Sequence, residues 1–107
     1  IWIGTFEKLI LNYLEFGDQL VDFFKNIIPD LNSDQIKESG REMLCNKAFE
    51  YINKLDLNEY FHLESLHKRS SPKLIIALEY VLTYFESNEK YEQCVKIRDV
   101  LNQVKSV

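Results

Sequence analysis

The spacing of apolar residues constrains this chain more than any other feature, because it repeats every three or four residues along most of the length. Residues 5–16 and 18–28 carry such stripes, and residues 34–55, 58–68 and 89–105 carry three more. Apolar side chains at this spacing cover one face of an α-helix. No stretch alternates apolar and polar residues as a half-buried strand does. The pattern therefore predicts an all-α fold.

The clearest helix start lies at Ser71 and Pro72. A serine suits the N-cap, and a proline suits the first helical position, where its missing N–H costs nothing. The helix that follows, over residues 72–86, is apolar on most sides, which is typical of a central helix. We expect Asn88 to cap a last helix over residues 89–105. The short connection predicts that these two helices form a C-terminal antiparallel hairpin.

The first half of the chain carries weaker boundary signals. Gly17 either breaks the first segment, with Asp18 capping a second helix, or is a weak point within one long helix. Pro29 ends this segment, and Asn32 stands three residues before a glutamine, which is the spacing of a capping box. Gly40 falls on the next apolar stripe, so we expect another helix to approach closely there. The whole pattern predicts a compact bundle of four or five helices.

Length and composition indicate one folded domain over residues 1–107. The chain is 46% hydrophobic and 28% charged, which is ordinary for a globular protein and excludes extensive disorder. Its formal net charge is -4, and residues 1–34 hold six acidic and only two basic side chains. Binding to nucleic-acid phosphates needs several basic groups on one surface, so a nucleic-acid-binding protein is disfavoured. One basic cluster, Lys68, Arg69 and Lys73, remains a candidate anion contact.

The cysteines and the absence of sorting signals bear on location. Cys45 and Cys94 are too few for a disulfide scaffold and have no CxxC spacing, so we expect two packed thiols in a reducing compartment. We find no signal peptide, and the longest apolar run is far shorter than the roughly 20 residues of a membrane span. These observations predict a cytoplasmic protein with no membrane contact. Its wealth of isoleucine, asparagine, lysine, tyrosine and phenylalanine suggests a bacterial or phage genome.

Patterns for catalysis and metal binding are weak. His62 and His67 are five residues apart, which sets their side chains about 140° apart around a helix, whereas zinc sites on helices favour a spacing of four. Cys94 has no base close by that would make it a nucleophile. The paired carboxylates fall on expected solvent faces rather than in a pocket. The sequence therefore predicts no enzyme, no metal site and no cofactor, with a metal-dependent enzyme as the remaining alternative.

Part of the last predicted helix resembles a known family. Residues 91–101 place an aromatic residue and an acid at Tyr91 and Glu92, and a charged pair at Arg98 and Asp99. This order is similar to the second helix of the UVR domain, a short helical hairpin of nucleotide-excision-repair proteins and some protease adaptors. The likeness spans residues 77–104, although Cys94 and Val95 stand where the family has alanines. The resemblance implies a protein-docking hairpin without catalysis.

The sequence is rich in aromatic residues for its size, and those that a small core cannot hide are typical anchors of protein interfaces. We therefore expect a small intracellular, non-catalytic protein–protein interaction module, either an adaptor or an assembly piece. Its partner is another protein, and a homo-oligomer of this chain is also compatible with the sequence. The candidate partner contacts are Trp2, Glu15, Asp18, Asp22, Tyr91, Glu92, Arg98 and Asp99. One alternative is an acidic inhibitor or immunity-type protein of phage or bacterial origin that blocks a basic target. A second is a helical nucleic-acid-binding protein that uses Lys68, Arg69 and Lys73.

Overall fold

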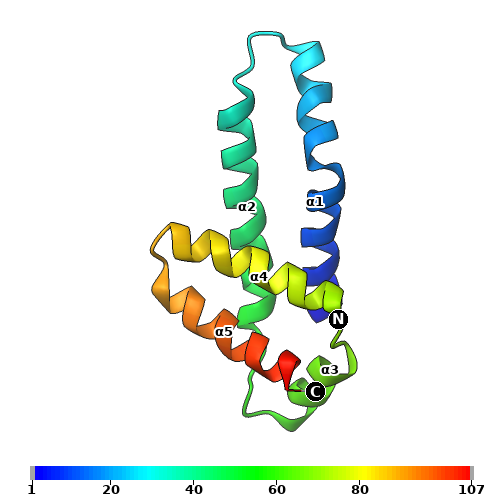
Figure 1. The fold of residues 1–107 in the computed structure, drawn as a ribbon, viewed down its shortest axis with the longest axis vertical. Coiled ribbons are helices and arrows are strands. Elements are labelled where there is room, and N and C mark those ends of the chain that lie inside the picture. Colours follow the sequence, from blue (N-terminus) through cyan, green and yellow to red (C-terminus); the bar gives the residue numbers. More distant parts are fainter. Residues whose placement is uncertain (1, 107) are drawn as a thin grey trace.

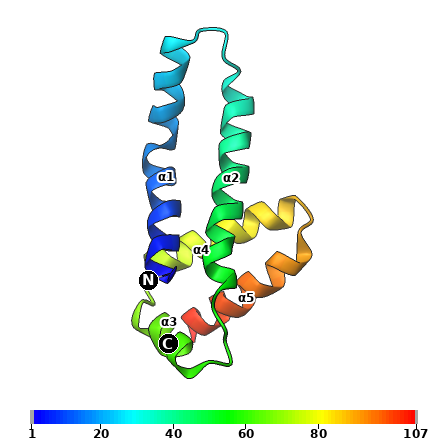
Figure 2. The same cartoon turned by 180° about the vertical axis from the view of Figure 1, so that it is seen from behind.

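A computed structural model describes residues 2–106, which form five α-helices and no strand (Figure 1). The helices are α1 (Trp2–Ile27), α2 (Ser33–Asn53), α3 (Tyr60–Lys68), α4 (Pro72–Ser87) and α5 (Tyr91–Lys105). α1 and α2 form a long antiparallel hairpin, α4 crosses its lower half, and α5 and α3 lie below α4 (Figures 1 and 2). The predicted all-α class and the C-terminal pair of packed helices are both confirmed.

α1 runs through Gly17 as one helix, which settles the alternative that the sequence left open. A glycine inside a helix costs about 1 kcal/mol, and this cost is small beside the packing of α1 against its neighbours. Asp18 therefore lies inside the helix, and its interpretation as an N-cap is wrong. Its carboxylate instead lies 3.6 Å from the ammonium of Lys37 on α2. α1 ends at Ile27, shortly before Pro29, as predicted.

Two predicted helix starts are confirmed by hydrogen bonds. The Oδ1 atom of Asn32 accepts from the backbone N–H groups of Asp34 and Gln35, at 3.1 and 3.2 Å. The hydroxyl oxygen of Ser71 accepts from the backbone N–H of Leu74 at 3.2 Å, with a proline at the first helical position. Such caps satisfy donors that have no partner within the helix. Both helix starts can be predicted from the sequence because the hydrogen-bonded groups are only two or three residues apart in the chain.

Asn88 does not cap the last helix, so this prediction is wrong. Its side-chain amide donates instead to the backbone carbonyl of Tyr84 at 2.8 Å and closes the end of α4. The chain then turns at Glu89, which takes a φ of 57°, and Lys90 occupies the N-cap position of α5 without a side-chain bond. An asparagine can satisfy carbonyls at a helix end as well as N–H groups at a helix start.

The core lies where α4 crosses the hairpin, because α4 contacts α1, α2 and α5. The residues that α4 contributes to this core are Leu74, Ala77, Leu78, Val81 and Phe85, which are all buried. Cys45 of α2 and Cys94 of α5 are both fully buried and unpaired, as predicted for packed thiols. The far ends of α1 and α2 extend beyond this core as a layer one helix thick (Figure 1).

Gly40 lies on α2 in the extended part of the hairpin. No atom of a neighbouring helix lies within 4 Å of the position that a Cβ atom would take there. The prediction of close helix approach at Gly40 is therefore wrong. The stripe of α2 that carries this glycine continues past the point where α4 crosses, and the neighbouring α1 does not reach the glycine closely at this level.

A tertiary hydrogen bond joins α5 to the chain just after α2. The half-buried Lys96 donates its ammonium to the backbone carbonyl of Leu55, a buried residue. A hydrogen bond to a charged group contributes about 1.5–3 kcal/mol. We therefore expect Lys96→Met to lower the free energy of unfolding by about that amount in urea titrations followed by circular dichroism. Lys73→Met, at an exposed site, serves as the control, and an equal loss in both variants would contradict the assignment.

Candidate protein interface

One apolar stripe runs the whole length of α1 at alternating intervals of four and three residues. It consists of Trp2, Phe6, Leu9, Tyr13, Phe16, Leu20, Phe23 and Ile27. This is the heptad spacing that keeps side chains on one face of a helix for packing against another helix. We call the second half of the stripe, Phe16, Leu20, Phe23 and Ile27, the α1 seam.

The first half of the stripe is covered by other helices. Phe6 is fully buried, and the ring of Trp2 meets the ring of His62 edge-on, with centroids 5.4 Å apart. Tyr13 lies beside Tyr80 of α4, with ring centroids 6.3 Å apart. The stripe is thus used as an internal packing face as far as the point where α4 crosses α1.

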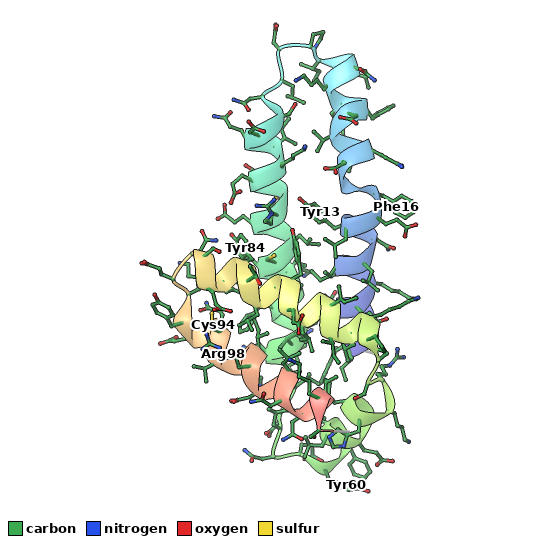
Figure 3. All side chains as sticks on the ribbon, viewed as in Figure 1. Tyr13, Phe16, Tyr60, Tyr84, Cys94 and Arg98 are labelled. Carbon is green, nitrogen blue, oxygen red and sulfur yellow. The ribbon has the colours of Figure 1, made fainter. Side chains whose placement is uncertain are left out.

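The α1 seam continues the same face beyond that crossing and is uncovered. The exposed fractions of Phe16, Leu20, Phe23 and Ile27 are 50%, 58%, 57% and 61%. Figure 3 shows Phe16 projecting from α1 on the side away from α2, whereas Tyr13 points toward the interior. A shallow groove of about 460 Å³ follows Tyr13, Phe16, Leu20 and Phe23. Contiguous exposed apolar surfaces are typical of interaction sites in proteins, which makes the seam the candidate site in this chain.

Uncharged groups flank the seam. Asn12, Gln19 and Asn26 follow one another at intervals of seven residues and form a row of amides along its outer edge. The acidic residues Glu15, Asp18 and Asp22 are exposed and, by the same helical periodicity, lie beyond this row of amides, about 110–170° around α1 from the seam. A partner that covers the seam therefore meets apolar and amide groups rather than carboxylates.

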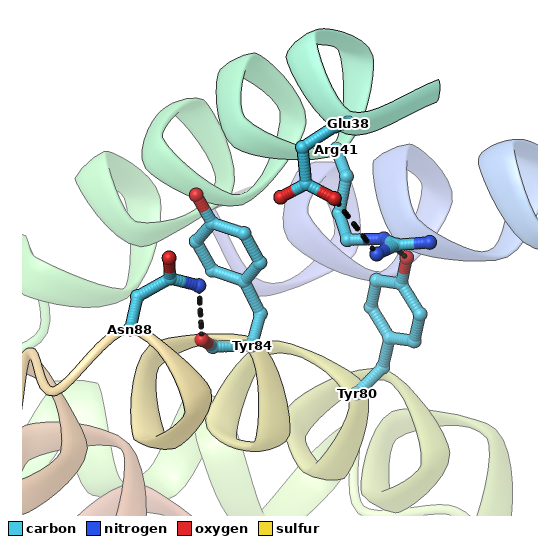
Figure 4. A network of polar contacts seen from close by, with 5 residues as sticks. All are labelled: Glu38, Arg41, Tyr80, Tyr84 and Asn88. Atoms are coloured by element: carbon cyan, nitrogen blue, oxygen red, sulfur yellow. Dashed lines mark hydrogen bonds and ion pairs between the residues drawn. The ribbon is translucent and has the colours of Figure 1, made fainter. Parts of the chain in front are cut away.

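A second hollow, of about 630 Å³, lies between α2, α4 and the middle of α1. The Nε atom of Arg41 donates to the hydroxyl of Tyr80 at 3.2 Å, and its Nη1 atom lies 3.3 Å from a carboxylate oxygen of Glu38 (Figure 4). The bond to Tyr80 raises the pKa of Arg41, and burial raises the pKa of Tyr80. Arg41 therefore stays charged and Tyr80 stays neutral near neutral pH, and the hydrogen bond between them joins α2 to α4.

The predicted partner contacts fall into two groups that do not form one surface. The first group lies on α1: Trp2, Glu15, Asp18 and Asp22. The second lies on α5: Tyr91, Glu92, Arg98 and Asp99. The acidic residues of the first group lie in the extended end of α1, whereas α5 belongs to the opposite end of the molecule (Figures 1 and 2). One partner that touched both groups would have to reach around α4.

Individual members of these groups are held in place to different degrees. Trp2 lies in α1, with its ring near that of His62 and 5.9 Å from the ammonium of Lys54. Arg98 lies 3.5 Å from the carboxylate of Glu86 on α4. Tyr91 is 63% exposed, and Glu92 and Asp99 are exposed as well.

The basic cluster does not converge on one point. Lys68 lies 3.0 Å from the carboxylate of Glu64, and the guanidinium of Arg69 packs against Gly4 at the start of α1. Lys73 is exposed in the first turn of α4, where the hydroxyl of Ser71 already accepts a backbone N–H. The three cations therefore face different neighbours.

The two histidines have separate partners. The Nδ1 atom of His62 accepts from the backbone N–H of Asp56 at 2.8 Å, and a ring nitrogen of His67 lies 3.4 Å from the side-chain oxygen of Gln103. Within residues 2–106, no three histidine, cysteine or acidic side chains are grouped as metal ligands would be. Among the described helices, none has the length and apolar character that a membrane crossing requires.

Sequence reasoning predicted more aromatic residues than the core can hide but did not locate the exposed ones on the second half of α1. The signal that would have found them is the length of the stripe. A helix of 26 residues is about 39 Å long, whereas α4, with 16 residues, spans about 24 Å and crosses it at an angle. One crossing helix cannot cover a heptad stripe that continues to the end of α1.

The fold and this surface define an all-α domain whose longest helix carries an uncovered apolar face. Comparisons of the chain with protein-family models, with curated proteins and with solved structures found no match.

Proposed function

We propose that this protein is a small, non-catalytic protein–protein interaction module and that the α1 seam is its binding face. The observation that carries the proposal is the abrupt change along one stripe, from Phe6, which is fully buried, to Ile27, which is 61% exposed. Large apolar side chains in a row are costly to leave in water, so a partner surface that covers them gains favourable binding energy.

Other features support the same class of function. The free thiols of Cys45 and Cys94 suit a reducing, cytoplasmic setting such as that of a bacterium or phage-infected cell. The antiparallel packing of α4 and α5 suits the docking hairpin that the UVR-like residues imply. In that hairpin Cys94 is buried and Val95 is 56% exposed, so only the first of the two residues that replace the family's alanines takes part in packing.

An acidic inhibitor of a basic target is the second candidate. Glu15, Asp18 and Asp22 follow one another at intervals of three and four residues and are all exposed, so they form an acidic row along α1. Such a row attracts a basic protein, and the attraction weakens with salt. This row and the seam lie on different sides of the helix, so the two candidates predict different contact points.

Site-specific photo-crosslinking separates the two candidates. A chain that carries p-benzoylphenylalanine in place of Phe23 is irradiated in extract of its own cells, and we expect covalent adducts with a protein, whether another chain or a second copy. The same probe at Tyr60, an exposed aromatic of α3, is the control and should give none. Adducts from a probe at Asp22 but not at Phe23 would favour the acidic inhibitor. An absence of adducts at both positions would contradict both proposals.

A further inference from the structure

We infer that the α1 seam binds the seam of a second copy of this chain, with the two α1 helices antiparallel. The inference rests on the proposed function, because it names the partner of the same surface. Phe16, Leu20, Phe23 and Ile27 have the spacing of the a and d positions of a coiled coil, which pack into the holes of an identical stripe. Phe16 then lies opposite Ile27 of the second copy, and Leu20 lies opposite Phe23.

The exposed side chains of the seam supply a little over half of the area that each partner of a standard interface buries. The four seam side chains are each half or more exposed, and at about 150–250 Å² for a fully buried aromatic they offer roughly 450 Å² of apolar surface per chain. The flanking Phe24, itself 43% exposed, and the amides beside the seam enlarge this footprint. Together they approach the roughly 800 Å² per partner of a standard interface.

The charge pattern favours a copy of the chain over a basic partner. The chain has a net charge of -4, so two copies repel unless their carboxylates stay apart. The carboxylates of Glu15, Asp18 and Asp22 lie on the side of α1 away from the seam, and amides flank the seam instead. Two seams can therefore meet without facing carboxylates, whereas a seam built for a basic partner would carry carboxylates on its rim.

The fold decides the direction of pairing. In each chain α4 crosses α1 beside Tyr13, immediately before the seam begins. In a parallel pair the two α4 helices would meet at the same level of the dimer and collide. In an antiparallel pair each α4 lies level with the turn at the tip of the other chain's hairpin, so the two α4 helices lie at opposite ends of the dimer.

The oligomeric state of the full chain tests the inference. Sedimentation is measured over about 1–100 µM, which spans the affinities expected for an interface of this size. We expect a dimer, and we expect Leu20→Glu to raise its dissociation constant at least about tenfold, as truncation of an interface anchor does. Val95→Glu is the matched control, because Val95 is 56% exposed and Leu20 is 58% exposed. Circular dichroism verifies that both variants remain helical.

Small-angle scattering tests the direction of pairing. An antiparallel dimer overlaps only along the seam, about 18 Å of helix, so its longest dimension should be about 84 Å, roughly 1.6 times the 51 Å of the single chain. A parallel dimer would stay close to 51 Å long, and this result would overturn the antiparallel arrangement.

Each outcome separates this inference from the proposed function. A dimer that Leu20→Glu leaves intact overturns self-pairing through the seam. A chain that remains monomeric but forms adducts from Phe23 with a different protein also overturns it, and the proposed function stands. A monomeric chain without any adduct from Phe23 overturns both.

Discussion

Replacing Phe85 by alanine should lower the free energy of unfolding by about 3–5 kcal/mol, the cost of removing a buried aromatic side chain and leaving a cavity. Phe85 is only 1% exposed and lies on α4 at the junction with α2. Its ring centroid is 5.5 Å from that of Phe49 and 5.2 Å from that of Tyr84, both in edge-on geometry. The variant therefore loses aromatic contacts as well as buried apolar area.

Phe61→Ala is the control, because it removes the same atoms from a residue of α3 that is 69% exposed. Its free energy of unfolding should stay within about 0.5 kcal/mol of the unchanged chain. Urea titrations followed by circular dichroism measure both, at one chain concentration, because pairing of chains adds to apparent stability. Equal losses in the two variants would show that Phe85 does not anchor the core.

The parts of the fold that were predicted depend on neighbours in the sequence. Ser71 and Asn32 cap helices through bonds to N–H groups two or three residues away, so the pattern itself carries the information. Asn88 was predicted wrongly because an asparagine between two helices can serve either one. Its amide closes the end of α4 rather than opening α5, and the sequence of the connection does not determine this choice.

The parts that were missed depend on residues far apart in the chain. Glu92 and Lys96 have the spacing of an ion pair within a helix, yet Lys96 donates to the carbonyl of Leu55, 41 residues away. Gly40 and the seam residue Phe23 both lie on apolar stripes, yet no neighbouring helix approaches Gly40 closely and Phe23 is 57% exposed. Periodicity shows which face of a helix is apolar. It does not show where a crossing helix ends, and that position decides which apolar residues form the core and which form an interface.

Cys45 should react with thiol reagents at least about tenfold more slowly in the folded chain than in the unfolded chain at pH 8, because the smaller thiolate fraction outweighs the greater nucleophilicity of a thiolate of higher pKa. Cys45 is fully buried, and this burial raises its pKa to about 12. An unfolded cysteine has a pKa of about 8.5, and only the thiolate is reactive. The rate of labelling by a disulfide reagent is measured in a Cys94→Ala variant, in which Cys45 is the one remaining thiol. Rapid labelling without denaturant would contradict the burial of Cys45.

The same shift makes stability depend on alkaline pH. Because the folded chain holds the Cys45 proton more tightly than the unfolded chain, its contribution is complete below about pH 8.5 and is lost as pH rises from there toward 12. Burial raises the pKa values of Tyr80 and Tyr84 in the same direction. Urea titrations at pH 8 and pH 10 should therefore show a fall in the free energy of unfolding. The fall in the free energy of unfolding should be smaller in Cys45→Ala, because this variant has no thiol at position 45 to ionise, although it is less stable at both pH values. An equal fall in the two chains would assign the effect to the tyrosines alone.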